Sequence, residues 1–373
     1  MKHTNSRPRR IVVKVGTSSL VDGGGSLDRD KMAALTRQLA EIRRQGREVI
    51  LVSSGAIRAG MERLGKTLRP RNIPEQQASA AVGQSLLMQT YADLLQNCGV
   101  IAAQVLLTRD DFHHRVRYLN ARNTLYTLLR FGCLPVVNEN DTVAVEEIRF
   151  GENDTLSALV AASVDADLLI NLSDVDGLFD ADPRAGSECR LIEEVSGITP
   201  EIERLAGGTH GTCGSGGMRS KIEAAKIAVS SGVRMVIANA SRPNVILDVA
   251  DGHNIGTRFL SSPVGLSQWK RWVAFGKGVK GSVTINEGAR KMVVERGKSL
   301  LAAGIVGCDG TFQVGDLVAV LDEHSRQVAR GLVNYCAAEV RLIKGKRSSE
   351  IEKILGHKDF DEVIHRDNLV LGV

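Results

Sequence analysis

The stretch IVVKVGTSS, residues 11–19, has the composition of a buried β-strand that ends in a tight turn. Ile and Val are typical of strands, and Gly followed by Thr and Ser is typical of turns. Lys14 interrupts the apolar run, and a charge in a buried strand is costly unless it meets an anion. The small residues that follow expose consecutive backbone N–H groups, which together with Lys14 suit a polyphosphate. The alternative is an edge strand whose lysine reaches solvent.

Strand-like runs of this kind recur through the first 260 residues, with helix-like stretches between them. The runs are residues 47–55, 99–108, 133–141, 167–174 and 233–240. Repeated β-α-β units with apolar strands predict an α/β fold, in which a mainly parallel sheet is covered by helices on both faces. Ligands of such sheets bind at the carboxyl ends of the strands, so the candidate site is sought there.

The pattern changes near residue 261. Residues 263–275 contain Pro263, Gly265 and both tryptophans, and we expect a linker between a domain of residues 1–262 and one of residues 276–373. Short apolar runs punctuated by Gly predict that the second domain is small and β-rich, with a short helix near its end. Residues 268–350 hold 14 Lys and Arg against 8 Asp and Glu, a net charge of +6. This region could meet nucleic acid or another anion, or it could be a solvated basic face.

The composition argues against a membrane protein and against a disulfide-linked one. No apolar run approaches the roughly 20 residues that span a bilayer. The six cysteines form no C-x-x-C motif and no zinc spacing with histidine. We expect buried thiols in a reducing compartment, and therefore a soluble cytoplasmic protein.

The octapeptide GMERLGKT, residues 60–67, fits the P-loop pattern G-x-x-x-x-G-K-[ST] letter for letter. A functional P-loop follows a strand directly and opens a helix. Here SSGAIRA separates the octapeptide from the preceding strand, and two prolines downstream oppose a helix that begins at Lys66. We predict instead the end of a helix, with Met61 and Leu64 facing inward and Gly65 as the stop.

Two polar clusters are better candidates for a substrate site. Residues 53–55, Ser-Ser-Gly, end a strand and could hold a phosphate or carboxylate, or could form an ordinary turn. The motifs NEND (138–141) and GEND (151–154) supply amides and carboxylates that could bind a substrate ammonium, orient lysines or reach Mg²⁺ through water. Asp154 or Thr155 could instead serve only as a helix cap.

Two further segments are candidates for a nucleotide site. GSGGMRSK, residues 214–221, is Gly-rich and precedes a helix, which favours anion binding and places Lys221 in the first helical turn. The alternative is a flexible surface loop. SDVDGLF, residues 173–179, follows a strand and could border the adenine or ribose, or could form a turn alone.

Together these segments resemble the amino-acid kinase family, in the branch that phosphorylates glutamate. Seven motifs carry the resemblance, in this order: VVKVGTSSL, VSSGAI, LLTRDDF with RYLNARNTL, PVVNENDTVA, GENDTLSALVA, LSDVDGLFDADPR and GSGGMRSKIEAA. The resemblance implies an αβα sandwich around the predicted sheet. The C-terminal series from VTINEGA to GLVNY is similar to a PUA domain, a module found on RNA-modifying enzymes and on many bacterial members of this branch.

The implied activity is ATP-dependent phosphorylation of the side-chain carboxylate of glutamate, the first step of proline synthesis, with Mg²⁺ as cofactor. The resemblance also implies feedback inhibition by proline and a homo-oligomer, a tetramer or a dimer. One alternative is a kinase of the same fold that acts on acetylglutamate, aspartate, carbamate or a nucleoside monophosphate. The other is an RNA-binding protein in which the basic C-terminal domain is the working part.

The resemblance also assigns roles by position. Lys14 and Lys221 match the lysines that stabilise the transferring phosphoryl group, and Asp154 matches the acidic residue that organises them. The expected glutamate contacts are Ser54, Asn138, Asp141 and Asn153. The expected nucleotide contacts are Lys14, Ser173, Asp174, Ser215, Gly216, Gly217, Met218, Arg219, Ser220 and Lys221. Members of the family often have Thr at 173, 215 and 220 and Asp at 152, and no direct Mg²⁺ ligand is predicted.

Overall fold

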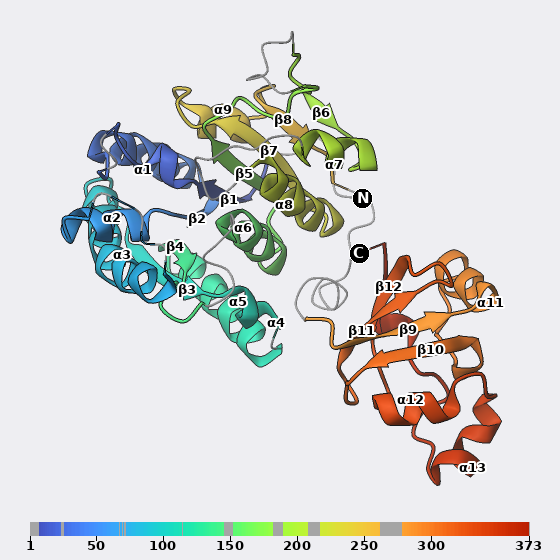
Figure 1. Ribbon diagram of the computed structural model, residues 1–373. Helices are drawn as coiled ribbons and strands as arrows, with labels where there is room; N and C mark the ends of the chain where they lie inside the picture. The colour runs from blue at the N-terminus through green and yellow to red at the C-terminus, as the bar shows by residue number, and fades with distance from the viewer. Residues whose placement is uncertain are drawn as a thin grey trace. The chain divides into compact units, whose positions relative to one another are not determined.

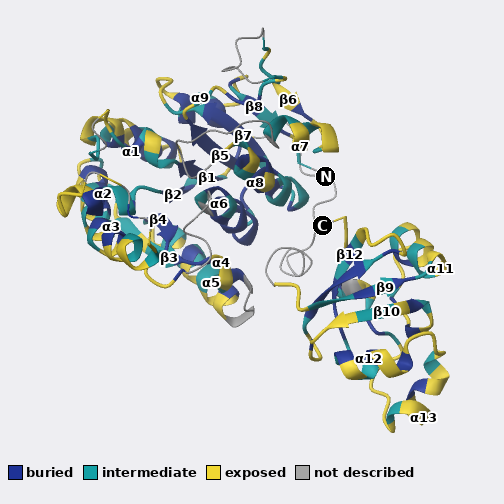
Figure 2. Cartoon of the chain, in the orientation of Figure 1, coloured by how far each residue is buried: buried dark blue, intermediate teal, exposed yellow. Residues whose placement is uncertain are grey.

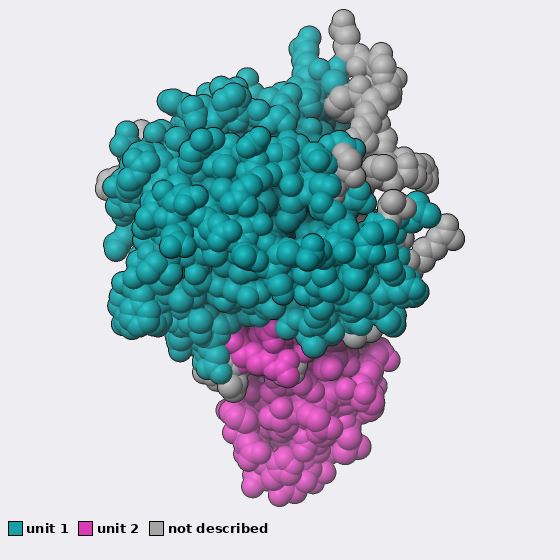
Figure 3. Space-filling view, turned by 90° about the vertical axis from the view of Figure 1, so that its left-hand side faces the viewer, with its two compact units in different colours: residues 1–109, 119–265 teal, residues 110–118, 266–373 magenta. Residues whose placement is uncertain are grey.

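A computed structural model describes residues 7–23, 26–66, 68, 70, 72–113, 115–144, 152–181, 189–207, 217–261 and 278–372. The chain forms two compact units, residues 1–109 with 119–265 and residues 110–118 with 266–373 (Figure 3). The predicted linker, residues 263–275, lies outside the described residues, so its borders stay a prediction.

The first unit is built on a sheet that, in the described residues, has eight strands in the order β3-β4-β2-β1-β5-β7-β8-β6 (Figure 1). Neighbouring strands are parallel except β7 and β8, which are antiparallel. The predicted mainly parallel sheet is therefore confirmed. The strands are β1 (Arg10–Val15), β2 (Glu48–Val52), β3 (Ala102–Leu107), β4 (Leu134–Glu139), β5 (Leu168–Ser173), β6 (Glu194–Val195), β7 (Arg234–Asn239) and β8 (Thr257–Phe259).

Helices cover both faces of this sheet, which confirms the αβα sandwich. Because side chains alternate along a strand, Ile11, Val13 and Val15 of β1 all face one side. There they share a buried core with α1 (Arg29–Arg44), α3 (Ile73–Gln96) and α9 (Val245–Ala250). Val12 and Lys14 face the other side, which α6 (Glu152–Ser163) and α8 (Met218–Ser230) cover. The central strands are buried along their length (Figure 2).

The first unit also contains α2 (Ala56–Arg63), α7 (Pro200–Gly207) and most of α5 (Arg115–Arg130). The helix α4 (Arg109–His113), except its first residue, and the first turn of α5 are grouped with the second unit. Among the described residues, no helix combines the length and apolar character needed to cross a bilayer.

The second unit has its own sheet and its own core, as predicted for a β-rich C-terminal domain. Within residues 278–372 its strands run in the order β10-β9-β11-β12-β13. Their pairing is antiparallel except between β9 and β11. The strands are β9 (Gly281–Ile285), β10 (Ile305–Gly310), β11 (Leu317–Leu321), β12 (Gln327–Leu332) and β13 (Leu369–Leu371), with helices α11 (Glu287–Arg290), α12 (Ala337–Ile343) and α13 (Ile351–Leu355).

Residues 60–66 of the octapeptide end a helix, as predicted, and do not form a P-loop, while Thr67 lies outside the described residues. Its first four residues finish α2, and Gly65 takes the left-handed φ of +66° that stops a helix. Met61 is buried, but Leu64 is 47% exposed, so the inward orientation predicted for Leu64 is wrong. The ammonium of Lys66 pairs with Glu75 of α3 at 3.0 Å.

Helices α2 and α3 touch each other through backbone atoms at two glycines. A Cβ on Gly60 would lie 1.7 Å from the carbonyl oxygen of Ser79, and one on Gly83 would lie 1.8 Å from that of Ala56. Any side chain here must force the helices apart. Because α2 begins at Ala56, two residues after Ser54, this contact fixes the place of Ser54 relative to α3.

We expect Gly83→Ala to lower the free energy of unfolding by about 2–3 kcal/mol, since the added methyl overpacks a backbone contact. Denaturant unfolding followed by circular dichroism measures this change. The matched control is Gly197→Ala, where no atom lies within 4 Å of the new Cβ. Equal stability of the two variants would contradict the role given to this helix contact.

Candidate active site

Two lysines from distant parts of the sequence meet at one buried carboxylate. The Nζ atom of Lys14, on β1, lies 2.6 Å from Oδ1 of Asp154, and that of Lys221, on α8, lies 3.6 Å from Oδ2. The exposed fractions of Lys14, Lys221 and Asp154 are 6%, 5% and 1%. Burying two ammonium groups is costly, and the shared carboxylate offsets part of that cost.

Two neutral side chains hold the Asp154 carboxylate from the sheet and from α8. The side-chain amide of Asn171 donates to Oδ1 at 2.9 Å, and the hydroxyl of Ser220 donates to Oδ2 at 2.6 Å. Asn171 is paired with Lys14 across β1 and β5, so the two side chains point to the same face of the sheet. The register of β1 with β5 and the first turns of α6 and α8 thus bring these side chains together at the Asp154 carboxylate.

The charges of this cluster shift the pKa values of its members. Burial raises the pKa of Asp154, but the ammonium groups of Lys14 and Lys221 outweigh that effect and lower it to about 2. Burial lowers the pKa of Lys221, Lys14 lowers it further, and the carboxylates of Asp154 and Asp174 raise it in part. Asp154 is therefore ionised throughout the physiological range.

The surroundings of the cluster can accept an anion. Gly16–Ser19 follow the last residue of β1, Val15, and a Cβ on Gly16 would lie 3.5 Å from the Nζ atom of Lys14. Helices α6 and α8 pack against each other and both begin at the cluster, so their positive ends reinforce the lysines. This is an environment for phosphate oxygens.

The predicted nucleotide contacts are placed in part. Gly217 caps α8, and Met218, Arg219 and Ser220 form its first turn. Ser215 and Gly216 lie outside the described residues. Ser173 is buried at the carboxyl end of β5, and its hydroxyl lies 3.2 Å from the carboxylate of the exposed Asp174.

The amide cluster predicted to bind the second substrate is assembled beside the lysines. The side-chain Nδ2 of Asn153, one residue before Asp154, donates to Ser54 Oγ at 2.9 Å and to Asn138 Oδ1 at 3.2 Å. Asp141 lies in the turn after β4. The loop after β2, the end of β4 and the start of α6 therefore contribute to one polar cluster.

Comparison with known proteins agrees with this geometry. Residues 9–239 match the model of the amino acid kinase family, and residues 281–355 match that of the PUA domain. The chain belongs to the amino acid kinase family. It is 53% identical to the glutamate 5-kinase of Caldanaerobacter subterraneus subsp. tengcongensis over 97% of both chains. It is also 51% identical to the glutamate 5-kinase of Carboxydothermus hydrogenoformans over 100% of both.

Among solved structures, the UMP kinase of Bacillus anthracis covers 69% of this chain and 98% of its own, with 15% identity and a TM-score of 0.48.

The carboxylate at the centre of the lysine cluster is engaged by other protein groups. Among the described residues, no group of three or more His, Cys, Asp or Glu side chains is placed to hold an ion. Both oxygens of Asp154 are already engaged by ammonium, amide and hydroxyl groups. Mg²⁺ commonly keeps several waters and binds through substrate phosphates, and it does not require a cage of protein carboxylates.

Asn171 and Gln84 are site residues that the sequence analysis missed. Asn171 is an amide inside the apolar strand LLINLS, the same kind of interruption that singled out Lys14 in β1. That signal was available. Gln84 lies on α3, and its Oε1 accepts from Asn138 Nδ2 at 2.7 Å. Gln84 stands in a helix with several glutamines, so nothing in the sequence distinguishes it.

We expect Asp154→Asn to lower the free energy of unfolding by about 3–5 kcal/mol at pH 7, because two buried ammonium groups lose their counter-charge. The pKa of Asp154 is about 2 in the folded protein against an ordinary 3.8, so its contribution is complete above pH 4 and lost as the pH falls toward 2. That loss amounts to about 2 kcal/mol.

Denaturant unfolding between pH 2 and pH 7 measures both effects, with the exposed Asp93→Asn as the control. A variant that keeps wild-type stability at pH 7 would show that Asp154 does not hold the lysines together.

Proposed function

We propose that this chain transfers the γ-phosphoryl group of ATP to the side-chain carboxylate of glutamate, giving γ-glutamyl phosphate. The observation that carries the proposal is the meeting of Lys14 and Lys221 at Asp154. About half of the sequence is identical to that of glutamate 5-kinases over nearly the whole length. The reaction is the first step toward proline, and ATP enters as its magnesium complex.

Charge is the main obstacle to this reaction. A carboxylate anion must approach a polyphosphate anion, and the transition state spreads negative charge over the phosphoryl oxygens. Lys14 and Lys221 are held in a site that excludes water, where positive charge acts more strongly than in solution. Asp154 keeps both ammonium groups in place before the substrates arrive.

The attacking carboxylate needs no general base. A glutamate side chain has a pKa of about 4.3 and is ionised at neutral pH, so no proton leaves the nucleophile. The residues of the site have only to align the carboxylate oxygen with the γ-phosphorus and to stabilise charge. This agrees with a site made of lysines, amides and hydroxyls.

The two substrates are assigned to opposite sides of the lysines. Ser54, Asp141 and Asn153 supply a hydroxyl, a carboxylate and an amide for glutamate. Ser173, Asp174 and the start of α8, which includes Gly217, Met218, Arg219 and Ser220, lie where the nucleotide would bind. Ser215 and Gly216 are proposed to extend that contact.

We expect Lys14→Ala and Lys221→Ala each to lower kcat by about 10²–10³, as for the loss of one preorganised donor. Formation of acyl phosphate, detected as the hydroxamate, measures the rate, and circular dichroism checks folding. The control is Lys66→Ala, since Lys66 pairs with Glu75 on the surface. Near-wild-type turnover of either variant would remove that lysine from the mechanism.

A panel of acceptors tests the choice of glutamate. Acetylglutamate, aspartate, carbamate and UMP are compared with glutamate in an assay of ATP consumption. Faster turnover of any of these than of glutamate would overturn the proposed function.

Proline is proposed to inhibit in competition with glutamate, and the enzyme is proposed to be a cytoplasmic tetramer or dimer.

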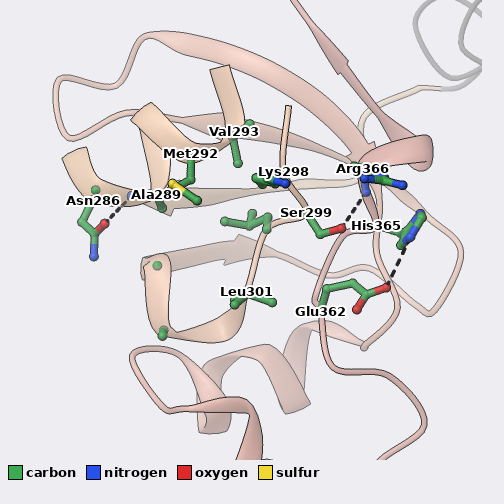
Figure 4. A pocket seen from close by; sticks show the side chains of 14 residues that line it. Asn286, Ala289, Met292, Val293, Lys298, Ser299, Leu301, Glu362, His365 and Arg366 are labelled. Carbon is green, nitrogen blue, oxygen red and sulfur yellow. Dashed lines mark hydrogen bonds and ion pairs between the residues drawn. The ribbon is translucent and has the colours of Figure 1, made fainter. Parts of the chain in front are cut away.

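A cavity in the second unit favours RNA contact as a second function. The cavity has a volume of about 620 Å³ and is lined by apolar groups such as Met292 and Leu300 (Figure 4). Lys298, His365 and Arg366 lie together on one side of it. Lys298 and Arg366 supply positive charge beside these apolar groups, which suits the sugar-phosphate and base of an RNA strand, although Glu362 also lines the cavity and no Phe, Tyr or Trp lines it for stacking.

We expect the full chain to bind single-stranded RNA with an affinity that falls as salt rises, because phosphate contacts release counterions. Lys298→Ala should weaken binding and reduce the slope of log K against log salt by about 1. Lys353→Ala, an exposed site on α13 that does not line the cavity, is the control. Binding that is absent, or insensitive to salt, would retire this second function.

A further inference from the structure

A chain of side-chain hydrogen bonds runs from α3 to the proposed glutamate site. Gln84 Oε1 accepts from Asn138 Nδ2 at 2.7 Å, Asn138 Oδ1 accepts from Asn153 Nδ2 at 3.2 Å, and Asn153 Nδ2 also donates to Ser54 Oγ at 2.9 Å. Asn138 is 1% exposed. It is therefore enclosed by protein groups and does not offer a surface to the substrate.

One backbone group determines which end of each side-chain amide in this hydrogen-bond chain is the oxygen and which is the nitrogen. The N–H of Glu139 can only donate, and it lies 2.9 Å from Oδ1 of Asn138. The amide oxygen of Asn138 must therefore face Glu139, and its NH₂ group must face Gln84. It follows that Gln84 presents its oxygen to Asn138, and that Asn153 presents its NH₂ group.

As a consequence, this series of hydrogen bonds ends at a buried acceptor, the side-chain oxygen of Asn153. Both hydrogens of Asn153 Nδ2 are used, by Ser54 and by Asn138. The Asn153 Oδ1 atom is buried and has no hydrogen-bond partner among the described residues. An unpaired buried acceptor is destabilising, and a donor from the substrate would satisfy it.

We propose that Gln84 is a positioning residue for acceptor specificity, which rests on the proposed function. By holding the NH₂ group of Asn138, Gln84 keeps the Asn153 carbonyl turned toward the substrate, where it accepts an N–H of the α-ammonium of glutamate. Asn138 is then also a positioning residue, and not the direct glutamate contact expected from the sequence.

The test compares glutamate with glutarate, the same dicarboxylate without the ammonium. In Gln84→Met the acceptor for Asn138 is lost, and we expect the affinity for glutamate to fall about tenfold or more. The affinity for glutarate, measured as a competitive inhibitor, and the KM for ATP should change by less than about twofold. Gln84→Glu keeps an acceptor oxygen and should retain the preference for glutamate.

Gln89→Met, an exposed position on the same helix, is the control and should behave as wild type. Gln84→Leu replaces Gln84→Met if the latter does not fold. Equal losses for glutamate, glutarate and ATP would mean a merely structural role and would overturn the inference, as would an unchanged glutamate affinity. Loss of the preference in Gln84→Glu equal to that in Gln84→Met would overturn it too.

The wild-type enzyme separates this inference from the proposed function. If wild type does not phosphorylate glutamate, the proposed function fails. If it does, and the Gln84 variants keep the wild-type ratio of glutamate to glutarate affinity, only the role of Gln84 fails.

Discussion

One buried carboxylate organises the site of this enzyme. Asp154 lies between two ammonium groups that would otherwise repel each other in a place closed to water. Its position draws together β1, β5, α6 and α8, because each supplies either the acid or one of its partners. The positive charge proposed for catalysis and the packing of the sheet against its helices therefore depend on the same contact.

The polar groups outside the charged cluster form a separate network of neutral side chains. The lysine side of the site is held by ions, whereas the side of Ser54 and Asn153 is held by neutral amides. This separation has a physical reason. A substrate that carries both an ammonium and carboxylates is oriented best when one region attracts anions and the neighbouring region offers hydrogen-bond acceptors.

The fold and the two lysines could be predicted from the sequence because each is indicated by a short stretch of residues. Apolar strands alternate with helices, and Lys14 interrupts its strand conspicuously. Leu64 was placed wrongly because apolar spacing does not reveal that the helix has already ended at Arg63. Gln84 could not be found, since its role depends on a contact 54 residues away along the chain. Hydrogen-bond direction is a property of the folded protein alone.

The glycine contact between α2 and α3 has a consequence for the shape of the proposed glutamate site. A wall fixed by side chains can widen when a rotamer changes, but here main-chain atoms of the two helices already touch. Enlarging the site for a bulkier acceptor would require displacing a whole helix. Redesign of this enzyme toward longer dicarboxylates is therefore a problem of backbone geometry before it is one of side-chain choice.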